Sequence, residues 1–307
     1  MKALVYKSTG SWYVIKNEAG EELNARIKGK FKIDNITSTN PIAVGDVVAI
    51  DKEDGEESIV ITNIQDRKNY ITRQSPHNKH LHHIVAANLD QSILLATLKE
   101  PRTSTGFIDR FLAASEAYHV PAIIVFNKSD LYKAKELAAF DKIKSIYEKI
   151  GYTVYSMSIH ENSGINEVKE LLKNKTTLLS GHSGVGKSSF INTIFPENII
   201  KTQEVSGWSG KGLHTTTFAE MFDLPFGGKI IDTPGMREFA MMDIEPHELS
   251  HYFPEMKALI NHCRFNNCMH IDEPDCAVKA AVEENRIAPE RYISYLNILA
   301  TIDNKKW

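Results

Sequence analysis

Gly181-His182-Ser183-Gly184-Val185-Gly186-Lys187-Ser188 is the stretch of sequence that decides the fold. The apolar run 177–179 before it predicts a strand, and residues 189–194 after it predict the start of a helix. The pattern G-x-x-x-x-G-K-[ST] between a strand and a helix is typical of a loop that binds phosphate through backbone N–H groups. Lys187 can then reach the β- and γ-phosphates, and the Ser188 hydroxyl can bind Mg²⁺. A glycine-rich turn with a chance Lys-Ser is the alternative.

Composition sets broad limits. The chain has 307 residues, 42% of them hydrophobic and 24% charged, which is typical of a globular protein of two or three domains. Nothing approaches the roughly 18 uninterrupted apolar residues of a membrane span, and the N-terminus has no apolar signal-peptide core. We therefore expect a cytoplasmic, monomeric protein with no membrane partner. A net charge of −3 means that any nucleic-acid surface must be a local patch.

The first 70 residues contain five short apolar runs separated by turn residues. The predicted strands include 3–6, 12–15, 25–27, 47–50 and 59–61. Strands at this spacing indicate a small closed β-barrel, with an OB-fold as the leading candidate, over residues 1–70. Residues 26–32 contain several basic side chains and one aromatic side chain: Arg26, Lys28, Lys30, Phe31 and Lys32. They could bind nucleic acid, or the lysines could keep the edge of a strand from aggregating.

Residues 66–86 are predicted to form a basic linker that contains four histidines, His77, His80, His82 and His83. A metal site is the less favoured interpretation, because no cysteine or carboxylate accompanies these histidines.

From residue 88 the chain alternates strands with helices. The expected strands are 91–97, 122–126 and 153–156, and the expected helices are 107–119, 133–150 and 165–173. This alternation indicates a mostly parallel sheet with flanking helices, which binds ligands at the carboxyl ends of its strands. We assign residues 71–240 to this domain, with 71–86 as its basic linker.

Asn127-Lys128-Ser129-Asp130 follows one of these strands. Asp130 can accept both hydrogens from the N1–H and 2-amino groups of guanine, and a buried carboxylate without such donors would reject adenine. Asn127 can hold the loop and contact the N7 side, while the stem of Lys128 packs on the base. Ser158-Ile159, after the next strand, lies where a backbone N–H could contact guanine O6.

Two further segments follow the phosphate loop. The strand 229–231 leads into Asp232-Thr233-Pro234-Gly235, in which Asp232 can hold Mg²⁺ through water and the Gly235 N–H can contact a γ-phosphate. The glycine-rich loop 210–217 carries three consecutive threonines. It is typical of a switch segment that becomes ordered only when γ-phosphate and Mg²⁺ are bound. Thr216 of this loop is expected to join Ser188 at Mg²⁺. Ser189 completes the predicted nucleotide-binding set.

The three cysteines form the pattern Cys263-x4-Cys268-x-His270-x5-Cys276. Three thiolates and one imidazole are typical of one closed, structural zinc site. Three buried cysteines with a chance histidine are the alternative. Helices expected over about 246–260 and 277–302 would flank the site in a zinc-binding domain, residues 241–307.

The order of these parts is circularly permuted, because the guanine-binding motif precedes the phosphate loop. This order, between a barrel and a cysteine cluster, resembles the ribosome-small-subunit-dependent GTPase A family (RsgA, also called YjeQ or YloQ). Ala87-Asn88-Leu89-Asp90-Gln91 and Ile108-Asp109-Arg110-Phe111-Leu112 resemble family segments as well. The resemblance implies an OB-fold, a permuted GTPase domain and a zinc domain. It also implies binding of GTP, GDP, the small ribosomal subunit and its rRNA, with a role in late maturation of that subunit. The implied GTP hydrolysis is slow alone and stimulated by that subunit.

The alternatives are a non-ribosomal GTP-dependent switch that binds a protein partner, and an ATPase, against which Asp130 argues.

The catalytic group is not the usual one. Met236 stands where Ras-like GTPases have the glutamine that orients the attacking water, and the resemblance implies a hydrophobic residue at this position. The resemblance implies that His214, in the G-x-H-T-T-T segment, takes over this role; a neutral imidazole can accept a proton or orient water. His214 could instead pack in its loop or touch RNA. Leu213 stands where an arginine is common in the family.

The connection between the nucleotide and zinc domains is short. Asp232–Gly235 leads almost directly into the zinc domain, so a γ-phosphate that orders this segment could move that domain as a lever.

Overall fold

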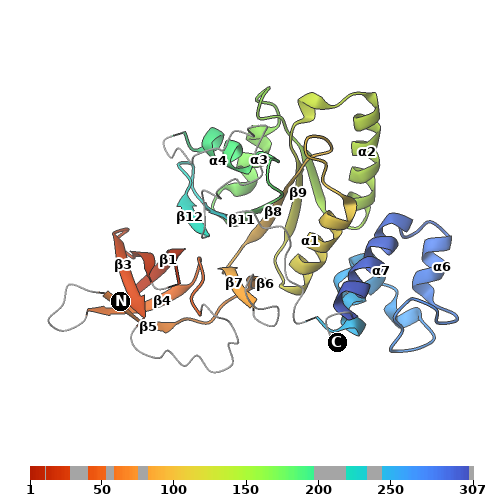
Figure 1. Cartoon of the computed structure of the whole chain (residues 1–307), viewed down its shortest axis with the longest axis horizontal. Helices are drawn as coiled ribbons and strands as arrows, with labels where there is room; N and C mark the ends of the chain where they lie inside the picture. Colours follow the sequence, from red (N-terminus) through yellow and green to blue (C-terminus); the bar gives the residue numbers. More distant parts are fainter. Residues whose placement is uncertain are drawn as a thin grey trace, which may run out of the picture.

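The computed structural model describes residues 1–10, 12–27, 41–52, 59–74, 82–196, 219–233 and 244–303. Figure 1 shows three regions in chain order: a β-barrel, a central sheet flanked by helices, and a helical C-terminal region that packs beside α1. None of the helices within these ranges combines the length and the apolar character needed to cross a membrane.

The N-terminal region is the predicted five-stranded barrel. Its strands are β1 Lys2–Ser8, β2 Tyr13–Asn17, β3 Glu22–Ile27, β4 Val47–Lys52 and β5 Ile59–Ile64. They follow the order β1-β2-β3-β5-β4, and β4 closes the barrel by pairing with β1. Alternate side chains point inward, and Val5, Tyr13, Ile15 and Val48 are fully buried. The expected OB-like barrel is thus confirmed, while Lys28, Lys30, Phe31 and Lys32 lie outside the described residues.

The central sheet runs in the order β10-β9-β8-β11-β13-β12. Its strands are β8 Gln91–Ala96, β9 Ala122–Phe126, β10 Thr153–Ser156, β11 Thr176–Ser180, β12 Glu220–Asp223 and β13 Lys229–Asp232. All neighbouring pairs are parallel except β12 with β13, which form a hairpin. The strands predicted from apolar runs are confirmed. β12 was not anticipated, because its sequence, Glu-Met-Phe-Asp, has no apolar run and only Met221 is buried.

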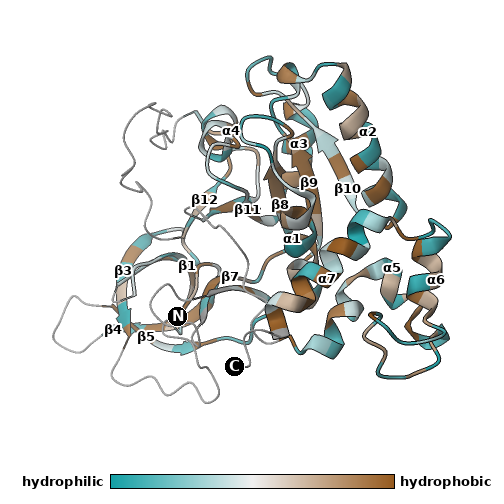
Figure 2. Ribbon diagram, turned by 45° about the vertical axis from the view of Figure 1, so that its right-hand side comes forward, coloured by the Kyte–Doolittle hydropathy of each residue, from teal (hydrophilic) through white to brown (hydrophobic). Residues whose placement is uncertain are grey.

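Helices cover both faces of this sheet. They are α1 Thr105–Ala117, α2 Ala134–Lys149, α3 Ile165–Leu172 and α4 Lys187–Ile194. Ile108 and Phe111 of α1 pack with Leu94 of β8, whereas Val168 of α3 and Phe190 of α4 pack with neighbouring residues of that strand on the other face. All six residues of β8 are buried, as expected for a central parallel strand covered on both sides, and Figure 2 shows this apolar centre.

The segment predicted as a linker is partly ordered into a hairpin. β6 Tyr70–Gln74 and β7 His82–Ala87 pair in a separate two-stranded sheet between the barrel and the nucleotide domain. The linker prediction was therefore wrong for these residues, because pairing between two strands across a loop is not visible in either strand alone. His77 and His80 lie outside the described residues.

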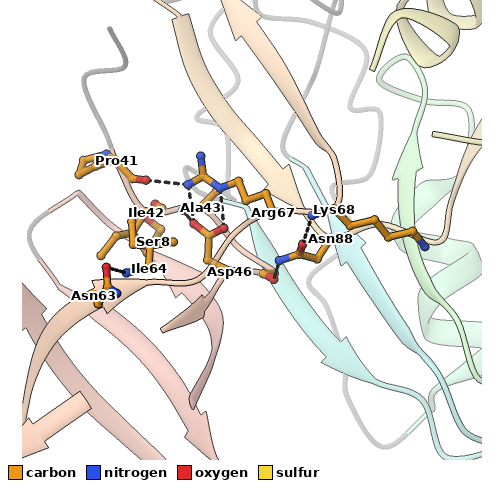
Figure 3. Close-up of polar contacts among 11 residues, drawn as sticks. Ser8, Pro41, Ile42, Ala43, Asp46, Asn63, Ile64, Arg67, Lys68 and Asn88 are labelled. Carbon is orange, nitrogen blue, oxygen red and sulfur yellow. Dashed lines mark hydrogen bonds and ion pairs between the residues drawn. The ribbon is translucent and has the colours of Figure 1, made fainter. Parts of the chain in front are cut away.

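A network of polar contacts joins the barrel to this connection (Figure 3). The guanidinium of Arg67 donates two hydrogen bonds to the carboxylate of Asp46, at 2.7 and 2.6 Å, and a third to Pro41 O. Asp46 is fully buried. Asn88, at the start of the nucleotide domain, donates to Gly45 O at 2.9 Å and accepts from the Lys68 N–H at 2.8 Å. These contacts fix where the chain leaves the barrel.

The C-terminal region differs from its prediction in two places. Instead of one helix over 246–260, the chain forms the 3₁₀ helix η2 Pro246–Tyr252, the single-turn α5 Pro254–Lys257 and η3 Ile260–His262. Pro254 explains the break, because the residue before a proline disfavours helical backbone and Phe253 is extended. Instead of one helix over 277–302, α6 Ala277–Glu283 and α7 Pro289–Asp303 are separate.

Candidate nucleotide site and metal centre

The phosphate loop lies between the end of β11 and the start of α4, as predicted. Gly181 and Gly186 have φ values of 147° and 102°, where other residues are strained. A Cβ on Gly186 would lie 2.4 Å from Asn127 Nδ2, and one on Gly181 would lie 2.3 Å from Leu95 O. These glycines therefore allow both the turn itself and the close approach of its neighbours. Val185 is buried under the loop, whereas Ser183 and Gly184 are exposed.

Lys187 begins α4 and curls over the loop. Its Nζ donates to Gly181 O at 2.7 Å and to His182 O at 3.0 Å. Burial lowers the pKa of Lys187, and the negative charge of Asp232 opposes that shift. The lysine charge is thus held at the phosphate loop beside a carboxylate.

Asp232 ends β13 and is buried, with a side chain whose Oδ1 has no hydrogen-bond partner among the described residues. Burial raises the pKa of Asp232, Lys187 lowers it, and Glu220 raises it further. The adjacent Thr233 hydroxyl is also buried without a described partner. A buried carboxylate oxygen without a described donor, beside the phosphate-loop lysine, fits the water shell of Mg²⁺. Ser188, the other predicted ligand, lies at the start of α4.

Asn127 joins the base-recognition loop to the phosphate loop. Its Nδ2 donates to Val185 O at 2.8 Å, and its Oδ1 accepts from the Ile159 N–H at 3.4 Å. Because Asn127 is 2% exposed, these contacts are shielded from water. One side chain therefore holds together three loops that are far apart in the sequence.

The predicted base-binding residues lie beside this junction. Lys128 has a left-handed backbone, φ 64°, and its Nζ donates to Glu100 O. Asp130 accepts a hydrogen bond from the Ser158 hydroxyl at 2.5 Å. Ser158 is fully buried and also accepts from the Glu161 N–H. The carboxylate predicted to select guanine is thus oriented by the second predicted loop.

A contact that the sequence did not suggest covers the phosphate loop. The His182 ring lies on the Phe107 ring, with centroids 3.7 Å apart and planes 31° apart. Phe107 is in the first turn of α1, whose N-cap Ser104 accepts from the Phe107 N–H. The first turn of α1 therefore contacts the phosphate loop through Phe107.

The structure does not place the remaining predicted residues in this site. His214, Thr216, Gly235 and Met236 lie outside the described residues, and their roles stay predictions. Ser189 is exposed on α4, and its backbone oxygen accepts from Thr193.

The four predicted zinc ligands converge. One donor atom from each of Cys263, Cys268, His270 and Cys276 lies within 4.8 Å of the others. His270 Nδ1 is 3.3 Å from Cys276 Sγ and 3.7 Å from Cys263 Sγ, so Nδ1 is the ring nitrogen that faces the sulfurs. Three thiols around one imidazole nitrogen fit a tetrahedral zinc ion, and no open position is left for water.

The loop that carries these ligands is held by tyrosines of α7. Tyr292 donates to His270 O at 2.6 Å, and Tyr295 donates to Met269 O at 2.7 Å. The loop with the four predicted ligands is thereby attached to the helix that packs against the nucleotide domain.

The sequence also did not reveal a buried ion network between α7 and α1. Arg291 donates to Asp109 of α1 at 2.7 Å and to both oxygens of Glu255 at 2.7 and 3.1 Å. Tyr147 of α2 donates to the same Asp109 oxygen at 2.6 Å. The side chains of Arg291 and Asp109 are only 2% and 1% exposed.

This topology and site define a class of protein. The strand order, the phosphate loop and the guanine-type loop that precedes it in the chain are those of a circularly permuted P-loop GTPase. Residues 64–242 match the RsgA GTPase family, and residues 2–60 match the RsgA N-terminal domain. The chain therefore belongs to the RsgA GTPase family, whose members are GTP hydrolases.

Relatives and solved structures are similar to this protein over nearly its whole chain. A protein of Flavobacterium psychrophilum named small ribosomal subunit biogenesis GTPase RsgA is 51% identical over 301 residues, which cover 97% of this chain and 92% of the relative. The protein of the same name from Cytophaga hutchinsonii is 51% identical, with both chains fully covered. The crystal structure of YjeQ from Thermotoga maritima has a TM-score of 0.77 and 37% identity, and covers 98% of each chain. That of YloQ, described as a circularly permuted GTPase, has a TM-score of 0.74 and 28% identity, with 99% and 95% covered.

Proposed function

We propose that this GTP hydrolase acts in the biogenesis of the small ribosomal subunit, binds that subunit and its rRNA, and is stimulated by it. The bond from Asn127 to Val185 O carries the nucleotide part of the proposal, because it fixes the guanine-type loop directly against the phosphate loop. The names of the relatives support the ribosomal part. In this reading Lys187 neutralises the phosphates, Ser188, Thr216 and water on Asp232 hold Mg²⁺, and Gly235 contacts the γ-phosphate.

Base selection is assigned to Asp130. Replacing Asp130 by Asn removes one acceptor and adds one donor, which suits xanthine, whose C2 carries an oxygen where guanine carries an amino group. We expect Asp130→Asn to lose at least tenfold in GTP affinity and to gain affinity for xanthosine triphosphate. Competition binding of the two nucleotides to the wild type and the variant measures this. Unchanged preference for GTP in the variant would remove Asp130 from base recognition.

The same variant gives a clean test of ribosomal stimulation. Purified ribosomal subunits carry traces of other GTPases, but these do not use xanthosine triphosphate efficiently. We expect small subunits, and not large subunits or free RNA, to raise hydrolysis of xanthosine triphosphate by Asp130→Asn. Equal stimulation by large subunits, or none by either, would favour a GTP-dependent switch for a protein partner instead.

His214 is proposed as the group that orients the attacking water. We expect His214→Ala to reduce subunit-stimulated turnover by about 10²–10⁴-fold, the usual contribution of an acid–base group, with GTP affinity nearly unchanged. His247→Ala, an exposed histidine outside the nucleotide site, is the matched control. Wild-type stimulated turnover in His214→Ala would rule out this assignment.

One structural zinc ion is proposed at Cys263, Cys268, His270 and Cys276. Zinc content of the purified protein should be close to one ion per chain and should fall in Cys276→Ser but not in His262→Ala, a nearby histidine outside the cluster. Zinc retained in Cys276→Ser would contradict the ligand set.

We further propose that nucleotide state is transmitted to the zinc domain. Only ten residues, 234–243, separate Thr233 from Ile244, where the described C-terminal region resumes. GTP would favour binding of the small subunit and GDP its release. Equal subunit affinity with GDP and a non-hydrolysable GTP analogue would disprove this coupling.

The domain limits 1–70, 71–240 and 241–307, a monomeric state and a cytoplasmic location belong to the same proposal. Light scattering of the purified chain tests the monomeric state.

A further inference from the structure

The barrel contacts the nucleotide domain at β12, the strand next to Asp232. β1 pairs with β12, where Lys7 lies opposite Glu220, and β12 pairs with β13, where Glu220 lies opposite Asp232. Figure 1 shows β1 and β12 meeting between the two domains. Because directly opposite residues of antiparallel strands project from the same face, Lys7, Glu220 and Asp232 form one row across three strands.

Each carboxylate in this row lies near one lysine. Lys7 Nζ is 3.0 Å from Glu220 Oε2, and the two side chains are 36% and 32% exposed. Glu220 is close enough for its charge to act on Asp232. On its other side, Asp232 faces the positive charge of Lys187. Each of the two neighbouring carboxylates therefore has a lysine of its own, one from the barrel and one from the phosphate loop.

We propose that Glu220 is a positioning residue for the magnesium–nucleotide site. Lys7 of the barrel sets how strongly the negative charge of Glu220 acts on that site. The proposal rests on the proposed function, which places Mg²⁺ beside Asp232. When Lys7 is paired with Glu220, the second carboxylate is largely neutralised. When Lys7 is drawn away by a ligand on the barrel, the site becomes more negative and holds a divalent cation more tightly.

The test is the MgCl₂ concentration that gives half-maximal binding of a fluorescent, non-hydrolysable GTP analogue. Lys7→Met leaves Glu220 uncompensated, so this concentration should fall about two- to fivefold. Glu220→Gln leaves Lys7 uncompensated, so the same concentration should rise by about the same factor. The double variant should return close to wild type. Raising the salt concentration should shrink both shifts, because the pair is partly exposed.

The opposite signs separate an electrostatic role from a structural one. A merely structural contact would shift both single variants in the same direction, and that result, or no shift in either, would overturn the proposal. Lys16→Met is the matched control, because Lys16 is also a barrel lysine but pairs with Asp223, three residues along β12 from Glu220. It should leave the magnesium dependence unchanged.

The variant Asp232→Asn distinguishes this proposal from the proposed function on which it rests. Asp232→Asn should raise the required MgCl₂ concentration more than any of the others. If it does not, the placement of Mg²⁺ at Asp232 is wrong. If it does while Lys7→Met and Glu220→Gln have no effect, only the contribution of the barrel is wrong.

Discussion

The nucleotide domain is attached to its two neighbours in opposite ways. On the C-terminal side, Arg291 is buried between Asp109 and Glu255, and it lies within a shared apolar core that includes Leu112 of α1 and Leu299 of α7. On the barrel side, β1 meets β12 through one register pair and a set of half-exposed polar contacts around Glu220 and Asp223. The ion pairs of the first attachment are buried, whereas those between β1 and β12 are partly exposed.

The two attachments also differ in their distance from the nucleotide along the chain. α1 belongs to the base-binding half of the domain and carries no residue predicted to respond to γ-phosphate. β12 follows directly after the segment that contains Thr216, and its hairpin partner β13 ends at Asp232. The strong attachment therefore holds a part of the domain that is expected to stay still, and the weak attachment lies where change is expected.

The largest effect is expected from breaking the buried network. Arg291→Met leaves Asp109 and Glu255 buried without their counter-charge, so the free energy of unfolding should fall by about 3–5 kcal/mol. Urea denaturation measures this.

Arg286→Met is the control for Arg291, because it removes an exposed pair with Glu284 and should cost less than about 1 kcal/mol. A combined Arg291→Met, Asp109→Asn, Glu255→Gln variant should recover part of the loss. A loss below about 1 kcal/mol for Arg291→Met alone would remove the distinction between the two attachments.

An intermediate effect is expected at the Asp46–Arg67 pair, which joins the barrel to the connecting hairpin. Arg67→Met leaves the fully buried Asp46 with the Ala43 N–H as a remaining donor, so the expected loss is about 2–3 kcal/mol. Lys68→Met, which breaks an exposed pair with Asp90, should change the stability by less than about 0.5 kcal/mol. Similar losses in both variants would show that burial does not decide the strength of these contacts.

The smallest effect is expected at Asp223, and it depends on pH. Burial alone raises the pKa of Asp223, but hydrogen bonds from Lys16 and Tyr6 and the nearby lysine charges outweigh burial and leave it below its ordinary value. Because the folded-state pKa is the lower one, the stabilisation is present at neutral pH and is lost as pH falls through the acidic range below about 4.

Asp223→Asn should therefore cost less than about 1 kcal/mol at pH 7, and this difference from wild type should disappear in acid. Urea denaturation at several pH values measures it. A difference that stays constant down to acidic pH would mean that the charge of Asp223 is not what joins the barrel to β12.

The parts of the fold that the sequence predicted are those whose signal is local. Each of these parts spans only a few residues and is recognised by residue type and spacing. They are the phosphate loop, the Asn127–Asp130 loop and the apolar strands β8 and β9. The cysteine cluster is local in the same sense, and its four ligands do converge.

The parts that were missed depend on partners far away in the chain. Arg291 and Asp109 are 182 positions apart, and neither residue type indicates burial until the other is placed beside it. The contact of His182 with Phe107 joins the phosphate loop to the first turn of α1, 75 positions earlier in the chain. The helix predicted over 246–260 is interrupted for a local reason, because Phe253, the residue before Pro254, has extended backbone.

The pairing of β1 with β12 has one more consequence, which concerns solubility. β12 is the last strand of the nucleotide-domain sheet, and the barrel strand covers its outer edge. An uncovered edge strand offers unpaired N–H and C=O groups to any other extended chain. A shortened protein that lacks the barrel would expose this edge and tend to self-associate. Pairing with the barrel is thus expected to protect one end of the GTPase sheet, while β10 lies at the other end.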